Sequence, residues 1–202
     1  MKEVRIEHEA GLTRIVLDRP AKANALTADM LEAVRDAVRA STGPALILTG
    51  AGKVFSAGAD FDAARAGLAT SPLWEEVSTA VASFPGLTLA ALNGSCAGGA
   101  LGMVLACDCR VTVPGAKFFY PVMKLGFLPQ PSDPRRLAAL VGPGRAKMML
   151  MCGAKVGAAE ALNWGLADRI AEDAEAAATE LAADALSAPE GHAAAIKTLF
   201  RR

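Results

Sequence analysis

Residues 93–102, with the sequence NGSCAGGALG, decide the fold of this chain. They follow a short apolar run, 87–92, and lead into an apolar segment, 103–107. This order predicts a strand that turns through paired glycines into a buried helix, a corner typical of α/β proteins. Backbone N–H groups at such a corner lack partners within the helix, and the helix dipole favours negative charge beside them. The corner is therefore suited to a carbonyl oxygen that becomes an anion.

A second corner of this kind lies upstream, at residues 55–61, FSAGADF. It comes after the strand-like run 45–49 and a glycine-containing loop. Two strand-to-glycine-to-helix corners could jointly supply two N–H donors to one oxygen. The sequence thus indicates an oxyanion hole that needs no side chain.

The composition favours one domain with a sizeable core and argues against nucleic acid as a partner. The 202 residues fit a single core, and hydrophobic residues make up 52% of them. Lysine plus arginine number 21 and aspartate plus glutamate number 21, so the formal net charge is zero. No apolar run is long enough to span a membrane, and the charged, strand-like start differs from a signal peptide.

Several common kinds of site are disfavoured by residue type and spacing. The four cysteines lack Cys-x-x-Cys spacing, so we expect buried free thiols and, most simply, a reducing cytoplasm. His8 and His192 lie near opposite ends of the chain, which disfavours a Ser–His–Asp triad or a histidine metal site. The glycines do not fit G-x-G-x-x-G, and Val54 follows Gly52-Lys53 where a phosphate loop needs Ser or Thr.

Strand and helix patterns alternate through the first two thirds of the chain and predict parallel crossovers. Alternation on both sides of Gly11 predicts a hairpin, and Thr27 is expected to cap a helix that stops before Gly43-Pro44. Further strands are expected at 45–49, 87–92 and 110–113. Beyond Pro129 the pattern is mainly helical, with helices expected at 134–140, 144–151, 158–164, 172–186 and 189–200.

Taken together, these residues resemble the crotonase (enoyl-CoA hydratase/isomerase) superfamily. Its two signatures are similar to 55–61 and 93–110, and supporting matches follow in the family's order through almost the whole chain. They include Leu17-Asp18-Arg19-Pro20, Asn24-Ala25-Leu26, Lys117-Phe118, Leu125-Gly126, Val141-Gly142, Cys152-Gly153 and Gly165-Leu166-Ala167. The resemblance implies an α/β fold with one crotonase-like domain over 1–202. A spiral of ββα units would occupy about 1–128, and a mainly helical region about 129–202.

The same resemblance implies a substrate and a site. The substrate would be an acyl-CoA or acyl-carrier thioester, with no metal and no cofactor apart from the coenzyme A that it carries. Its carbonyl oxygen would lie between the N–H groups of Ala59 and Gly99. Backbone near Ala23, Ala25 and Ala57 would line the adenine and pantetheine channel. The other expected binding positions are Gly58, Asp60, Phe61, Gly98, Gly102, Val122 and Gln130. Asp60 equally fits a helix cap, and family members commonly form trimers or hexamers.

The chain departs from the family where proton transfer is expected. Hydratases of this family use two glutamates, and the matching positions here are Gly102 and Val122, which cannot move a proton. A working aspartate of other members falls at Gln130, and an amide cannot act as a base near neutral pH. Asp133 is the main remaining candidate, although it could simply cap the following helix. Weaker candidates are Asp62 and Tyr120.

Two functions therefore remain open. The first is an enzyme that stabilises an enolate, as an isomerase, a decarboxylase or an atypical hydratase rather than a two-glutamate hydratase. The second is a catalytically silent acyl-CoA binder, or a partner subunit of an active paralogue. The helical region is also expected to be shorter than in the family, which would leave an apolar patch favouring self-association or a partner.

Overall fold

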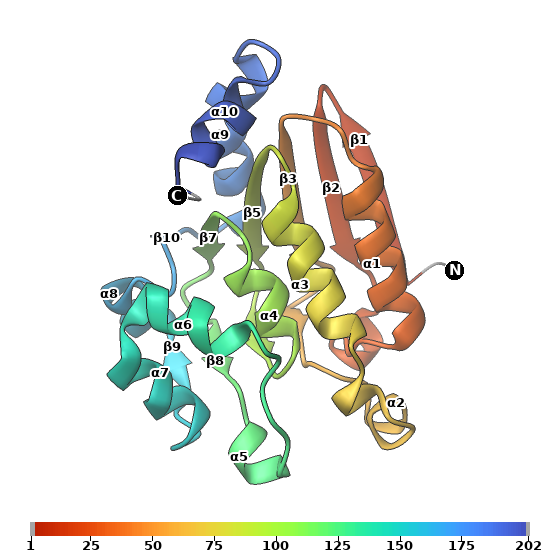
Figure 1. Cartoon of the computed structure of the whole chain (residues 1–202), viewed down its shortest axis with the longest axis vertical. Helices are drawn as coiled ribbons and strands as arrows, with labels where there is room; N and C mark the ends of the chain where they lie inside the picture. Colours follow the sequence, from red (N-terminus) through yellow and green to blue (C-terminus); the bar gives the residue numbers. More distant parts are fainter. Residues whose placement is uncertain (1–2, 201–202) are drawn as a thin grey trace.

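A six-stranded sheet runs through the upper part of the molecule (Figure 1). In the computed structural model, which describes residues 3–200, the strand order is β1-β2-β3-β5-β7-β10. β1 and β2 form the antiparallel hairpin, and each later neighbour joins in parallel. The strands span Val4–Glu9, Leu12–Leu17, Ala45–Gly50, Leu87–Leu92, Cys109–Thr112 and Arg169–Ile170.

Helices cover both faces of this sheet, which explains why its central strands are apolar on both sides. One core contains Leu46 and Leu48 of β3 together with residues of α1, α3 and α4. The other contains Ala45 and Ile47 of the same strand together with alanines of α9. α10 follows α9, and both lie at the upper end of the molecule in Figure 1. These helices span Ala28–Ala40, Leu73–Ser83, Ala100–Leu105, Ala174–Ser187 and His192–Leu199.

A second, smaller sheet has the order β4-β6-β8-β9, and its strands were not predicted individually from the residues. β4, β6 and β8 pair in parallel, and β9 joins antiparallel. Each of its first three strands follows a strand of the large sheet and precedes a helix, which gives the expected spiral of ββα units. The strands span Val54–Ser56, Ser95–Ala97, Lys117–Phe119 and Val156–Gly157, and α2 and α5 span Phe61–Arg65 and Val122–Leu125.

The region after Pro129 is mainly helical, as predicted, with bounds that differ by up to three residues. β9 and β10 interrupt the helices there. Within residues 3–200, no helix has the length and apolar character needed to cross a bilayer. The remaining helices are α6, α7 and α8, which span Asp133–Val141, Pro143–Leu150 and Ala158–Trp164, and two short 3-10 turns at Pro20–Lys22 and Leu68–Thr70.

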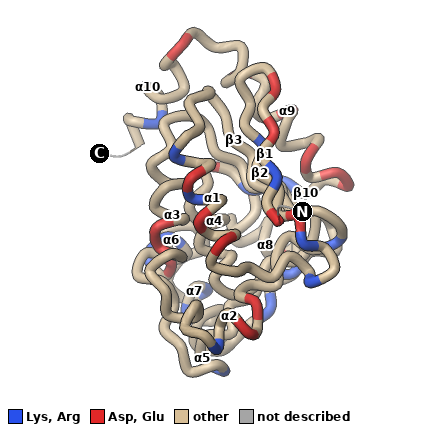
Figure 2. The backbone as a smooth tube through the Cα atoms, turned by 90° about the vertical axis from the view of Figure 1, so that its right-hand side faces the viewer, with Lys and Arg blue, Asp and Glu red and all other residues tan. Residues whose placement is uncertain are grey.

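Local predictions are mostly confirmed. Thr27 caps α1, since its hydroxyl accepts from the Met30 N–H at 3.3 Å. All four cysteines are free, and Cys96 and Cys107 are buried as expected, but Cys152 is exposed, so the expectation of burial is wrong there. Acidic and basic residues occur together along the chain (Figure 2), in keeping with the zero net charge.

Candidate functional site

The two predicted corners lie in contact. β4 and β6 are parallel neighbours, with Ser56 opposite Cys96, so their carboxyl ends deliver both corners to one place. Gly58 and Gly98 have φ values of +92° and +58°, which side chains rarely adopt. A Cβ at Gly58 would lie 2.9 Å from the Ala97 carbonyl oxygen and 3.5 Å from the Gly98 Cα. Glycine at position 58 therefore allows the two corners to touch.

The residue after each of these glycines carries a free amide. Within residues 3–200, neither the Ala59 N–H nor the Gly99 N–H donates a hydrogen bond. Both residues retain some exposed surface. By contrast, the N–H of the preceding residue, Gly98, donates a hydrogen bond to the Phe119 carbonyl at 3.0 Å. Two unused donors thus follow two touching glycines.

The first corner is held by the segment that precedes α1. The Ala57 N–H donates to the Ala23 carbonyl at 2.9 Å, and the Leu26 N–H donates to the Gly58 carbonyl at 2.7 Å. The structure therefore brings the predicted positions 23, 25, 57 and 58 together around one corner.

Asn24 fixes this segment from within the protein. The side chain is fully buried, and its amide donates to the Ala51 carbonyl at 2.9 Å and to the Val54 carbonyl at 2.7 Å. Its side-chain oxygen accepts from the Arg19 N–H at 2.8 Å. These bonds join the segment to β4, and the sequence analysis missed this role because the partners lie about 30 residues away.

Asp60 is a helix cap in this structure. One carboxylate oxygen accepts from the N–H groups of Asp62 and Ala63, and the other accepts from Arg19 at 2.7 Å. The hydrogen bond from Arg19 lowers the pKa of Asp60. Both oxygens are thus occupied within the protein, and a direct contact with substrate stays a prediction.

Trp74 of α3 shapes the second corner and was also missed. A Cβ at Gly99 would lie 2.9 Å from the indole ring, so the ring occupies the space that a side chain would need. The indole N–H donates to the Leu68 carbonyl at 2.8 Å, which orients the ring. No local sequence signal connects position 74 with position 99.

Asp133 is buried beside Gly102. The carboxyl accepts a hydrogen bond from the Tyr120 hydroxyl at 2.9 Å through Oδ2. A Cβ at Gly102 would lie 2.9 Å from the other oxygen, Oδ1. Asp133 is the first residue of α6 and Ser132 occupies the cap position. Among the described residues, the Asp133 side chain makes no capping bond. The helix-cap interpretation of Asp133 is therefore wrong.

The burial of this carboxyl changes its protonation. Desolvation raises the pKa of Asp133 to about 6, and the hydrogen bond from Tyr120 and the positive charge of Arg136 oppose that rise. Burial and the neighbouring Asp133 charge raise the pKa of Tyr120, so its hydroxyl stays a donor at neutral pH. Asp62, the other acidic candidate, lies exposed on α2. Within residues 3–200, no three His, Cys, Asp or Glu side chains meet as a metal site requires.

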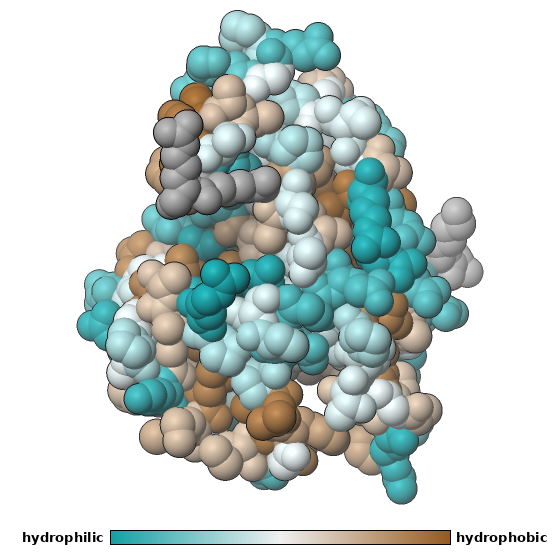
Figure 3. Space-filling view, in the orientation of Figure 1, coloured by the Kyte–Doolittle hydropathy of each residue, from teal (hydrophilic) through white to brown (hydrophobic). Residues whose placement is uncertain are grey.

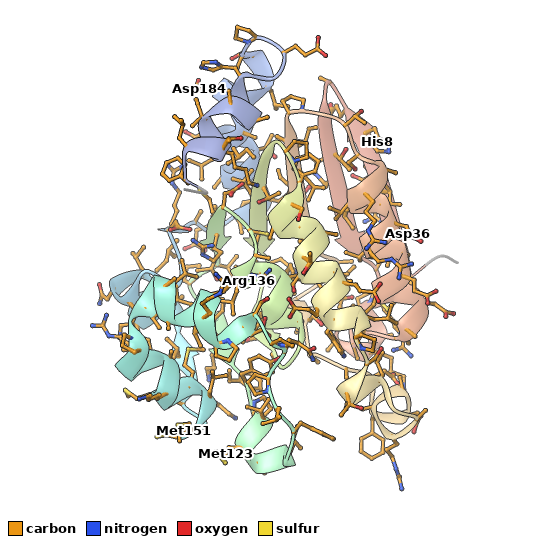
Figure 4. The ribbon with its side chains drawn as sticks, viewed as in Figure 1. His8, Asp36, Met123, Arg136, Met151 and Asp184 are labelled. Atoms are coloured by element: carbon orange, nitrogen blue, oxygen red, sulfur yellow. The ribbon has the colours of Figure 1, made fainter. Side chains whose placement is uncertain are left out.

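An apolar groove of about 550 Å³ is lined by residues that are close in sequence to Tyr120 and Asp133. Val122 and Pro134 contribute to it, each within two residues of Tyr120 or Asp133. Figure 3 shows apolar side chains gathered at the lower end of the molecule, and Figure 4 places the lining residues Met123 and Met151 there. Of the remaining predicted positions, Phe61 is exposed on α2 and Gln130 is partly exposed before α6.

The comparisons with known proteins identify the family. The family model described as enoyl-CoA hydratase/isomerase matches residues 7–202. This chain belongs to the enoyl-CoA hydratase/isomerase family. It is 37% identical over 179 residues to a Mycobacterium tuberculosis protein named probable enoyl-CoA hydratase echA6, covering 86% of this chain and 73% of that one.

Other relatives of this family member include one with a different named activity. A 4-chlorobenzoyl coenzyme A dehalogenase-2 of an Arthrobacter species is 34% identical over 185 residues, covering 85% of this chain and 67% of that protein. The crystal structure of an enoyl-CoA hydratase from Bacillus anthracis superposes with a TM-score of 0.91 at 28% identity, covering 100% of this chain and 83% of that one. The family is thus shown, and its named reactions differ from one relative to another.

Proposed function

We propose that this family member is an acyl-CoA enzyme with a backbone oxyanion hole and a single catalytic carboxyl. The N–H groups of Ala59 and Gly99 would bind the thioester oxygen and stabilise the charge of an enolate. Asp133 would move the proton. The observation that carries this proposal is the position of the Asp133 carboxyl, next to the point where a side chain at position 102 would begin.

A single carboxyl favours isomerisation over hydration. Hydration by two glutamates divides water activation and proton delivery between two groups, whereas one carboxyl can take a proton and return it elsewhere. The Asp133 carboxylate would remove a proton from the α carbon, and the C–H electrons would form the enolate held by the two amides. The protonated carboxyl would then deliver that proton to the γ carbon, and the enolate would collapse to the conjugated thioester.

Loss of carbon dioxide from a substrate would generate the same enolate, and neutral Asp133 could then protonate it. Both routes need the two amides and one carboxyl. A pKa of about 6 suits both, because the acid and base forms are then both accessible near neutral pH.

The test is proton exchange at carbon in heavy water. The wild-type protein is incubated with β,γ-unsaturated, α,β-unsaturated and carboxylated acyl-CoAs, and mass spectrometry reads deuterium uptake and conversion. Asp133→Asn should lower the rate by about 10²–10⁴-fold, the usual contribution of a positioned acid or base. Asp184→Asn is the matched control, since Asp184 lies exposed on α9 at the opposite end from α5 (Figure 4).

Two outcomes would overturn the proposal. Turnover that survives Asp133→Asn would exclude the carboxyl as the proton carrier. Saturable acyl-CoA binding without exchange or conversion of any substrate would instead support the silent binder. The full burial of Asp133 is the observation that keeps this second function in consideration.

A further inference from the structure

Among the residues that the structure describes, the Asp133 carboxyl has a hydrogen-bond partner on one side only. Tyr120, which follows β8, donates its hydroxyl proton to Oδ2 at 2.9 Å, and both side chains are buried. The Asp133 backbone is fixed as well, since its N–H donates to the Gln130 carbonyl at 3.0 Å. The carboxyl therefore has a defined position and one defined partner.

The second oxygen faces Gly102 of α4. Within residues 3–200, Oδ1 is a buried atom without a hydrogen-bond partner. A Cβ on Gly102 would lie 2.9 Å from Oδ1, closer than real Cβ contacts allow, and 3.2 Å from Oδ2, which is tighter than most of them. A buried polar oxygen without a partner is costly, so its persistence calls for an explanation. Glycine at position 102 leaves room for this oxygen.

We propose that Tyr120 is a positioning residue that occupies Oδ2 of Asp133 and so leaves Oδ1, beside Gly102, as the oxygen that takes and returns the proton. This inference rests on the proposed function and deepens it. Tyr120 was a candidate proton carrier in the sequence. Here it acts through Asp133 and does not itself exchange a proton with substrate.

The charged groups around Asp133 determine how loss of Tyr120 should act. Arg136 on the same helix lowers the pKa of Asp133, and Glu75 on α3 raises it. Figure 4 places Arg136 on the side of α6 that faces α3 and α4. Glu75 accepts from the Ser132 N–H at 3.1 Å and from its hydroxyl, and neither contact involves Tyr120. Removing the Tyr120 hydroxyl removes a hydrogen bond that stabilises the carboxylate. The effect of burial is then opposed less strongly, so the pKa of Asp133 should rise further.

The variant Tyr120→Phe tests the proposal without turnover. The Asp133 carboxyl carbon is labelled with ¹³C, assigned by its absence in Asp133→Asn, and titrated by NMR in the ligand-free protein. The midpoint should move above the wild-type value of about 6. The pH profile of kcat/KM should move in the same direction, with KM nearly unchanged.

Thr49→Val is the matched control. It removes another buried hydroxyl, which donates to the Ala91 carbonyl at 2.9 Å within the large sheet. Both variants should lose some stability, but only Tyr120→Phe should shift the Asp133 titration. An identical shift in both variants would assign the effect to general loosening and overturn the proposal.

A second measurement needs no variant of Tyr120. Tyr120 is the only tyrosine in the chain, so ¹³Cζ-labelled tyrosine gives one signal. That signal should titrate with a midpoint of about pH 6 in the wild type and stay flat in Asp133→Asn. A flat signal in the wild type, or an unchanged Asp133 midpoint in Tyr120→Phe, would overturn the role of Tyr120. The two titrations could give the predicted results in a protein that exchanges no thioester proton. That outcome would overturn the proposed function and still support the contact between Tyr120 and Asp133.

Discussion

The two halves of the proposed site are built in different ways. The Ala59 and Gly99 half is backbone, delivered by two neighbouring parallel strands and two glycines with positive φ. The Asp133 half consists of the side chains of Asp133 on α6 and of Tyr120 after β8, which lie next to Gly102 of α4. The first half depends on local turns, whereas the second depends on how distant helices pack. In the proposed site, the two amides and the carboxyl are therefore positioned by different parts of the fold.

The largest effect expected on the backbone half comes from removing one of its two amides. Ala59→Pro keeps a Cβ but removes the N–H, and the bonds that hold this corner do not use that N–H. Losing one donor of an oxyanion hole typically lowers kcat by about 10²–10³-fold. Ala59→Gly keeps the N–H and should retain most of the activity. Steady-state kinetics, with thermal unfolding to check the fold, measures both, and an active Ala59→Pro enzyme would contradict the role of this amide.

The next prediction concerns the carboxyl half, because the buried Asp133 carboxylate should lower the free energy of unfolding. The pKa of Asp133 is about 6 in the folded protein and about 3.9 in an unfolded chain. The folded state therefore holds more protons between these values, and its stability falls as pH rises through them. About two pKa units, at about 1.4 kcal/mol each, amount to about 3 kcal/mol.

Asp133→Asn removes this penalty. The difference in unfolding free energy between Asp133→Asn and the wild type should increase, in favour of the variant, by about 3 kcal/mol from about pH 4 to about pH 8. This change should be centred between the two pKa values. Urea unfolding at a series of pH values measures the difference, and Asp184→Asn should run parallel to the wild type. Parallel curves for Asp133→Asn would mean that Asp133 titrates normally in the folded protein.

The two halves also differed in how well the sequence predicted them. Both glycine corners were predicted because paired glycines after apolar strands are a local signal. The strands of the second sheet were not predicted individually because β4, β6 and β8 have three residues each, too few for a periodic pattern. Asp133 was found only by elimination, since nothing local predicts that α6 packs against Gly102. Trp74 and Asn24 were missed for the same reason, because their partners are distant in the sequence.

The smallest effect separates the space at Gly102 from ordinary helix propensity. Alanine normally stabilises a helix relative to glycine by about 0.5–1 kcal/mol. Within residues 3–200, nothing lies within 4 Å of a Cβ added at Gly144 of α7, so Gly144→Ala should be stabilising. Gly102→Ala would push the new Cβ against the Asp133 carboxyl and should destabilise by about 1–3 kcal/mol. Calorimetry of both variants gives the signs, and a stabilised Gly102→Ala would show that Asp133 does not fill this space.

The most direct measurement of the central claim is the stretching frequency of a bound thioester carbonyl. An acyl-CoA labelled with ¹³C at that carbonyl is compared by infrared difference spectroscopy free in water and bound to Asp133→Asn, which should bind without turnover. Two preorganised N–H donors should polarise the C=O bond more than water does, so the frequency of the bound carbonyl should fall below that of the free one. Adding Ala59→Pro should bring the bound frequency part of the way back to the free value. A bound frequency equal to or above the free value would contradict the claim that the Ala59 and Gly99 amides share one thioester oxygen.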